Sequence, residues 1–223
     1  MSLLLAAAAA AALTPLAADD VLARYTAALA ALKEPRVFTV EYTMLQTGTR
    51  SLEQTHRIFR SGDDERDEII AVNGTRAVRP TVRIFRNRRY RYTVAALAPK
   101  PAQYDFTYVG PHRAGRHLDY VFRLAPHAAK PAFAFTQVVV DGLTFLPRSV
   151  DFATSSHAGA GSVMFVKAER WWVARLANAR ARLPGGTAHE RIAFLHWRFP
   201  PSLPASTFSA PRALLTPPPL VSP

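Results

Sequence analysis

The chain has 223 residues, of which 49% are hydrophobic and 20% charged, with a formal net charge of +12 and no cysteine. This length suits one domain, and this composition can fill a core, so we expect most of the chain to be ordered. The lack of cysteine excludes disulfide bonds, a thiolate nucleophile, cysteine ligands for zinc and a lipid anchor on cysteine.

The N-terminus has the pattern of a secretory signal peptide. A run of leucine and alanine extends from Leu3 to Leu13, small residues follow, and the first charges are Asp19 and Asp20. This run is too short to span a bilayer. We expect a signal peptide over residues 1–18, cleavage near Ala18 and a periplasmic protein. The alternative interpretation is an alanine-rich helix of the mature chain.

One amphipathic helix is predicted after this segment. Asp19 or Asp20 is placed to cap its first turn, and Pro35 ends it. The apolar residues that recur at helical spacing are Val21, Leu22, Tyr25, Leu29 and Leu32.

After Pro35 the hydrophobic period changes to alternation, which predicts strands. Asn73-Gly74 is the strongest hairpin signal, because both residues tolerate positive φ. The predicted strands are 38–45, 52–59, 68–72, 82–86, 89–92, 104–109, 117–124, 133–140, 146–154, 162–173 and 191–199. Short strands at regular spacing, separated by turns, predict an antiparallel sheet that curls into a barrel or half-barrel.

Motifs for catalysis and for metal binding are missing from the sequence. The seven histidines lack metal-ligand spacing, no Gly-x-Ser-x-Gly elbow occurs, and no lysine follows the glycine turn at 159–161. The acidic residues between 63 and 68 are interpreted as a solvated hairpin end. We therefore expect no catalytic residue, no metal and no cofactor, with the histidines scattered over surface and core.

Two features bear on anionic partners. The mixture of arginine and aromatic residues at 83–92 occurs in proteins that bind single-stranded nucleic acid, but strand alternation, with cations outward and rings inward, explains it more simply. We expect no nucleic acid partner for an exported protein. The net positive charge instead favours transient contact with an anionic membrane surface.

Alternation also gathers aromatic and branched side chains on one face of consecutive strands. Because one long helix is too little to cover a sheet of this size, we expect an apolar cavity that binds a lipid. A fully packed core is the alternative. The predicted lining residues of the cavity are Phe38, Tyr42, Met44, Tyr90, Tyr92, Phe106, Tyr108, Tyr120, Phe122, Phe133, Phe135 and Phe152.

The order of these elements resembles a known family. The helix and the long meander precede an Asp141–Pro147 turn, a Val150-Asp151-Phe152 run and a closing strand, Arg191–Pro200. In this order the chain resembles periplasmic lipoprotein carriers of the LolA/LolB type. The resemblance implies a mainly β protein with few helices, an open antiparallel half-barrel whose N-terminal helix covers the concave face. It also implies a cavity for acyl chains, and 171–183 is the best candidate for a second helix.

These observations predict one half-barrel domain over 19–208 and a proline-rich disordered tail over 209–223. The leading hypothesis is a monomeric periplasmic protein that binds or carries a lipid or an acylated lipoprotein, without catalysis. The alternative is an envelope interaction or sensor module that binds a protein or an anionic polymer. An enzyme acting on an envelope component is the least favoured option.

Overall fold

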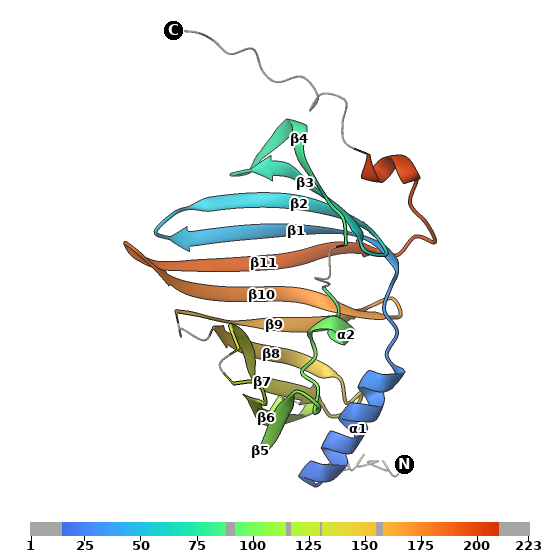
Figure 1. The fold of residues 1–223 in the computed structure, drawn as a ribbon, viewed down its shortest axis with the longest axis vertical. Coiled ribbons are helices and arrows are strands. Elements are labelled where there is room, and N and C mark those ends of the chain that lie inside the picture. The colour runs from blue at the N-terminus through green and yellow to red at the C-terminus, as the bar shows by residue number, and fades with distance from the viewer. Residues whose placement is uncertain (1–14, 88–91, 115–116, 130, 155–157, 210–223) are drawn as a thin grey trace, which may run out of the picture.

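The structure is a computed structural model, and it describes residues 15–87, 92–114, 117–129, 131–154 and 158–209. In these residues one 11-stranded antiparallel sheet is accompanied by short helices (Figure 1). The helices are α1 (Ala18–Ala31), α2 (Val94–Leu97) and the 3-10 helix η1 (Ala205–Phe208). The strands are β1 (Val37–Gly48), β2 (Leu52–Ser61), β3 (Asp64–Val72), β4 (Thr75–Phe85), β5 (Tyr104–Ala114), β6 (His117–Pro126), β7 (Phe133–Asp141), β8 (Pro147–Thr154), β9 (Gly159–Ala168), β10 (Trp171–Leu183) and β11 (Gly186–Arg198).

The sheet is open, and its edges are consecutive strands of the chain. The order across it is β4-β3-β2-β1-β11-β10-β9-β8-β7-β6-β5. Strands that follow one another in sequence therefore pair, except β4 and β5, and the first strand also pairs with the last in the interior of the sheet. The connection from β4 to β5 has to pass from one edge to the other, and it carries α2 across the sheet (Figure 1). This confirms the expected half-barrel.

Helix α1 lies against one face of the sheet, which we call the inner face. Its buried residues are Val21 and Tyr25, and the Tyr25 ring contacts Phe106 of β5 at 5.7 Å between centroids. Directly opposed residues of an antiparallel pair share a face. The register therefore extends the inner face from Phe106 to Leu124 of β6 and onward through the sheet. This is the predicted covering of the concave face by the N-terminal helix.

Several strand predictions are confirmed and two assignments are wrong. The Asn73-Gly74 turn joins β3 to β4 with φ of 48° and 75°. Residues 162–173 do not form one strand, because the chain turns at Glu169, whose φ is 53°, between β9 and β10. Residues 171–183 are not a helix but strand β10. Pairing with β9 and β11 on both sides outweighs the helix propensity of this Ala-, Arg- and Leu-rich segment.

The segment after β4 also differs from the prediction. Most of the strand expected at 89–92 lies outside the described residues. Tyr92 precedes an isolated bridge between Thr93 and Val173, and the Thr93 side chain caps the short helix α2. This helix is absent from the predicted elements, because a single turn leaves too short a periodic signal in the sequence.

The acidic residues at 63–68 are mostly buried, so the prediction of a solvated hairpin end is wrong. Glu65 accepts a hydrogen bond from Arg60 at 2.9 Å, and Asp67 lies 2.7 Å from His56. All four side chains are buried. His56 and Arg60 lie on the same face of the preceding strand, β2, and each contacts a carboxylate of β3 within the hairpin. A carboxylate buried in this way needs such a partner, because an isolated charge in the core is very costly.

Gly161 is required by close packing on the inner face. It pairs with Phe152 of β8, and a Cβ at this position would lie 2.2 Å from the Asn178 carbonyl oxygen and 2.5 Å from the Phe152 ring. A backbone oxygen in the sheet cannot move aside cheaply. At Gly159 the nearest atom to an added Cβ is a methyl group of Thr154 at 3.1 Å, which can adjust.

We predict that Gly161→Ala lowers the free energy of unfolding by about 2 kcal/mol, the typical cost of overpacking. Gly159→Ala on the same strand is the matched control and should cost much less. Urea denaturation monitored by circular dichroism measures both. Equal costs for the two substitutions would contradict the packing described at Gly161.

Arg148 joins a buried and a partly buried carboxylate on neighbouring strands. Its guanidinium contacts Asp119 of β6 at 3.0 Å and Asp141 at the end of β7. Burial raises the pKa of Asp119, and Arg148 offsets only part of that rise. Burial also acts to raise the pKa of Asp141, but hydrogen bonds from Thr144 and Leu143, with Arg148, hold that pKa below its ordinary value. Asp141 therefore stabilises the fold above its unfolded pKa, and this stability is lost as pH falls through the lowered folded pKa.

We predict that Arg148→Met lowers the free energy of unfolding by about 2 kcal/mol at pH 7, since it leaves two neighbouring carboxylates uncompensated. Protonation of the carboxylates removes the repulsion, so the loss should shrink at pH 4. Urea titrations of both proteins at the two pH values test this. A loss that is the same at both would show that Arg148 acts by packing alone.

Candidate functional site

A row of apolar side chains crosses the inner face from β1 to β5. Each member is directly opposite the next in the strand register, so all of them point to the same side. The row consists of Met44, Ile192, Ala177, Val163, Val150, Val138, Phe122 and Tyr108. On the β2 side it ends at Gln54, opposite Met44. The inner face therefore offers a continuous apolar row that passes over eight strands.

A second, parallel row lies nearer to the β10–β11 turn. Its opposed residues are Gln46, Glu190, Ala179, Gly161, Phe152 and Phe135. This row is apolar only from β10 to β7. Phe133 continues it at the start of β7, where its ring contacts Phe135 and Phe152 at centroid distances of 5.3 and 5.0 Å. Phe133 is 45% exposed although its ring contacts two other rings.

The twelve residues predicted to line a cavity divide into three groups. Phe38, Tyr92, Tyr120 and Phe122 are buried in the core. Tyr42, Met44, Phe106, Tyr108, Phe133, Phe135 and Phe152 remain partly or largely accessible on the inner face. Tyr90 lies outside the described residues. We call the second group, together with Ala177 and Ile192, the open inner face.

The alternation along β10 and β11 adds residues that the prediction missed. Ala177 and Ile192 complete the apolar row between Met44 and Val163. The signal was present in the alternation of alanine with asparagine and arginine over 177–182. It was obscured because the same residues are good helix formers.

Helix α1 is fixed to the inner face by a buried phenol. The Tyr25 hydroxyl donates a hydrogen bond of 2.6 Å to the Pro99 carbonyl oxygen, and both residues are buried. The Tyr120 hydroxyl accepts a hydrogen bond of 3.2 Å from the Leu16 backbone N–H. Burial raises the pKa of Tyr25 far above its ordinary value, so the phenol stays protonated. These contacts hold α1 over β5 and β6.

Near the start of β10 the strands β10 and β11 separate. The two strands pair only from Leu176 and Ala193 onward. Nearer to Trp171, β10 is instead hydrogen-bonded to the β4–β5 connection, because the Ala174 backbone N–H donates to the Tyr92 carbonyl oxygen. A bulge in β11 at His196, with φ of 50°, turns Trp197 back to the inner face. The indole N–H of Trp197 then donates a hydrogen bond of 3.1 Å to the Ala174 carbonyl oxygen.

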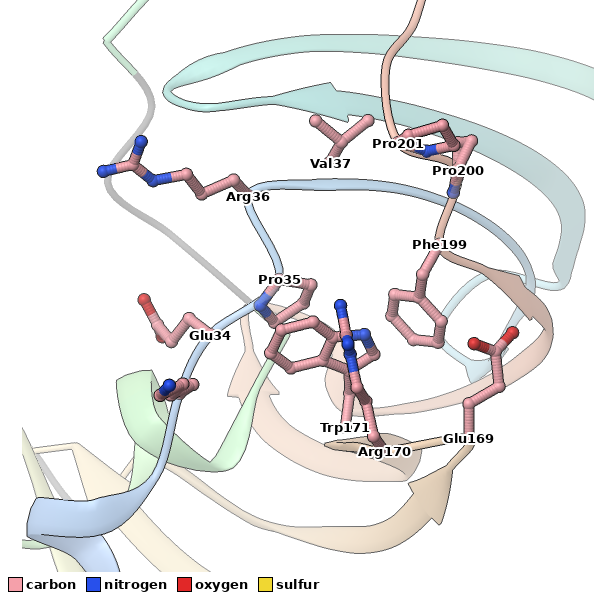
Figure 2. A pocket seen from close by; sticks show the side chains of 11 residues that line it. Glu34, Pro35, Arg36, Val37, Glu169, Arg170, Trp171, Phe199, Pro200 and Pro201 are labelled. Carbon is pink, nitrogen blue, oxygen red and sulfur yellow. The ribbon is translucent and has the colours of Figure 1, made fainter.

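A pocket of about 810 Å³ lies at this separation, and we call it the mouth pocket (Figure 2). Its apolar lining consists of Pro35, Val37, Trp171, Phe199, Pro200 and Pro201. The α1–β1 linker with the start of β1, the start of β10 and the segment that follows β11 supply these residues. The pocket therefore forms where the first and last parts of the domain meet.

No group of three or more histidine or acidic side chains in the described residues is placed to hold a metal ion. Within the same residues, no helix has the length and apolar composition that crossing a membrane requires. The open inner face and the mouth pocket are two candidate binding features.

No protein-family model matches the chain, and no curated protein sequence matches it. Solved structures with the same architecture do match. A putative outer membrane lipoprotein-sorting protein domain from Vibrio parahaemolyticus has a TM-score of 0.50 and 13% identity, over 86% of this chain and 97% of that one. A LolA superfamily protein from Nitrosomonas europaea has a TM-score of 0.49 and 11% identity, over 88% and 99%. The first match shows that the chain has the fold expected from its sequence.

We predict that Tyr25→Phe lowers the free energy of unfolding by about 1.5 kcal/mol, since the buried Pro99 carbonyl loses its donor. Tyr108→Phe is the control, because the Tyr108 hydroxyl has no hydrogen bond to the described residues. Thermal unfolding of the two variants measures the difference. Equal losses would contradict the anchoring role of Tyr25.

Proposed function

We propose that this protein is an exported carrier that binds the acyl chain of a lipid or an acylated lipoprotein on the open inner face. The observation behind the proposal is the apolar row from Met44 to Tyr108, part of which stays accessible although α1 covers the other part. Accessible apolar surface on a sheet face is costly unless it meets a ligand or a partner.

The energetics of this face suit hydrocarbon. Each methylene moved from water contributes roughly 0.8 kcal/mol, so ten methylenes contribute on the order of 8 kcal/mol before the costs of association. The pleated inner face is built of valine, isoleucine and phenylalanine side chains, which do not require hydrogen bonds from the ligand. Such a site selects for chain shape and length and not for a polar group.

The comparison with solved structures supports the proposal at the level of fold. The Vibrio domain is described as a putative outer membrane lipoprotein-sorting protein. We propose a periplasmic location for this chain, because its N-terminal segment reads as a signal peptide. We also propose that it acts as a monomer and meets anionic membrane surfaces transiently, since its net charge is +12.

A second candidate is a module that binds an acidic protein or polymer. The observation in its favour is a set of exposed arginines on β10 and β11, Arg180, Arg182 and Arg191, which make no ion pair with the described residues. Such binding would weaken steeply with salt, whereas binding of a neutral acyl probe would not. The salt dependence of ligand binding therefore separates the two candidates.

We predict that Ala177→Phe weakens binding of a myristoyl probe at least tenfold, because the new ring fills the apolar row between Val163 and Ile192. Ala193→Phe is the matched control on β11, since Ala193 pairs with Leu176 and Thr43 on the opposite face. Isothermal titration of folded variants measures the affinities. Unchanged affinity in Ala177→Phe, or no binding of any acyl probe by the unmodified protein, would overturn the proposed function.

A further inference from the structure

The mouth pocket combines aromatic walls with charge. Its charged lining residues are Lys33, Glu34, Arg36, Glu169 and Arg170. The three cations are exposed and make no ion pair with the described residues. Arg170 holds its guanidinium over the Trp171 ring, 4.7 Å from the ring centroid (Figure 2).

The two carboxylates are placed differently from the cations. Glu34 accepts a hydrogen bond of 2.7 Å from the Thr93 hydroxyl, on the side of the pocket next to α2. Figure 2 shows Glu169 on the opposite side, beside Phe199. The pocket lining therefore has one more positive than negative charge, and one of its carboxylates is already engaged by the protein.

A line of aromatic rings joins this pocket to the open inner face. Trp171 contacts Phe199 at 6.0 Å between centroids, and Phe199 stacks on Trp197 at 6.0 Å with an interplanar angle of 7°. Trp197 in turn lies 6.1 Å from Phe194, and Phe194 lies 5.6 Å from Tyr42. Tyr42 is two residues before Met44, the start of the apolar row. Ring contacts thus run without a break from the pocket to the start of the row.

We propose that the mouth pocket binds the anionic headgroup of the acyl ligand, a phosphate or a carboxylate, while the chain follows the rings to the open inner face. This inference rests on the proposed function. Guanidinium and ammonium groups form short, charge-assisted hydrogen bonds with phosphate and carboxylate oxygens, and aromatic walls lower the local dielectric constant around them. Arg170, already oriented by Trp171, loses little freedom when it binds an anion.

The test compares ligands that differ only in the headgroup. The probes are 1-myristoyl lysophosphatidic acid, myristate and the neutral 1-myristoylglycerol. Tryptophan fluorescence reports binding directly, because Trp171 and Trp197 lie on the proposed path. We expect both anionic probes to bind at least tenfold more tightly than the neutral one at low salt. The ratio between the two anionic probes tells a phosphate preference from a carboxylate preference.

The variant Lys33→Gln/Arg36→Gln/Arg170→Gln should remove most of this tenfold preference and leave the affinity for 1-myristoylglycerol unchanged. Its matched control is Arg76→Gln/Arg79→Gln/Arg83→Gln on edge strand β4, which changes the net charge equally and should keep the preference. Circular dichroism and thermal unfolding establish that both variants are folded.

Each outcome decides between the two proposals. If 1-myristoylglycerol binds as tightly as the anionic probes, the headgroup site is wrong and acyl binding stands. If both triple variants lose the preference equally, net charge and not the mouth pocket causes it, and the inference is again overturned. If none of the three probes binds, the proposed function itself fails.

Discussion

The pairing of β1 with β11 inside the sheet determines how the rest of the molecule is arranged. Because the first and last strands meet there, β4 and β5 become the two edges although they are consecutive in the chain. Their connection has no other course than across the sheet, so it brings Tyr92, Thr93 and α2 onto the inner face. The same pairing places the end of β11 beside the α1–β1 linker, where the mouth pocket forms.

The inner face is chemically divided along the strand order. On β2 and β3 its buried positions hold the Arg60–Glu65 and His56–Asp67 pairs, which satisfy each other within the protein. From β1 through β11 to β5 the row from Met44 to Tyr108 is apolar. Hydrocarbon would therefore be bound on the β5 side of the sheet, while the paired charges give the β2–β3 side a fixed and polar boundary. A division of this kind orients an elongated ligand without any specific hydrogen bond to its chain.

The sequence predicted the features that depend on local periodicity. Alternation identified the inner residues of β1, β6 and β7, and Asn73-Gly74 identified its hairpin, because these signals do not depend on distant partners. The strand β10 was mistaken for a helix, since its residues favour a helix until β9 and β11 pair with it. The bulge at His196 shifts the alternation, so Trp197 could not be assigned to the inner face from its position. Burial of Glu65 and Asp67 likewise depends on Arg60 and His56 across a hairpin. Which of the predicted lining residues are covered depends on where α1 and α2 lie, and periodicity does not carry that information.

The central claim, that hydrocarbon lies along the apolar row of the inner face, is tested most directly by nuclear magnetic resonance with a spin-labelled fatty acid. A nitroxide on the acyl chain broadens the methyl signals of residues close to it. We expect selective broadening at Ile192 and Val163, with little effect at Leu45 and Leu195, which are exposed on the opposite face. Broadening at Leu45 and Leu195 with none at Ile192 and Val163 would contradict it.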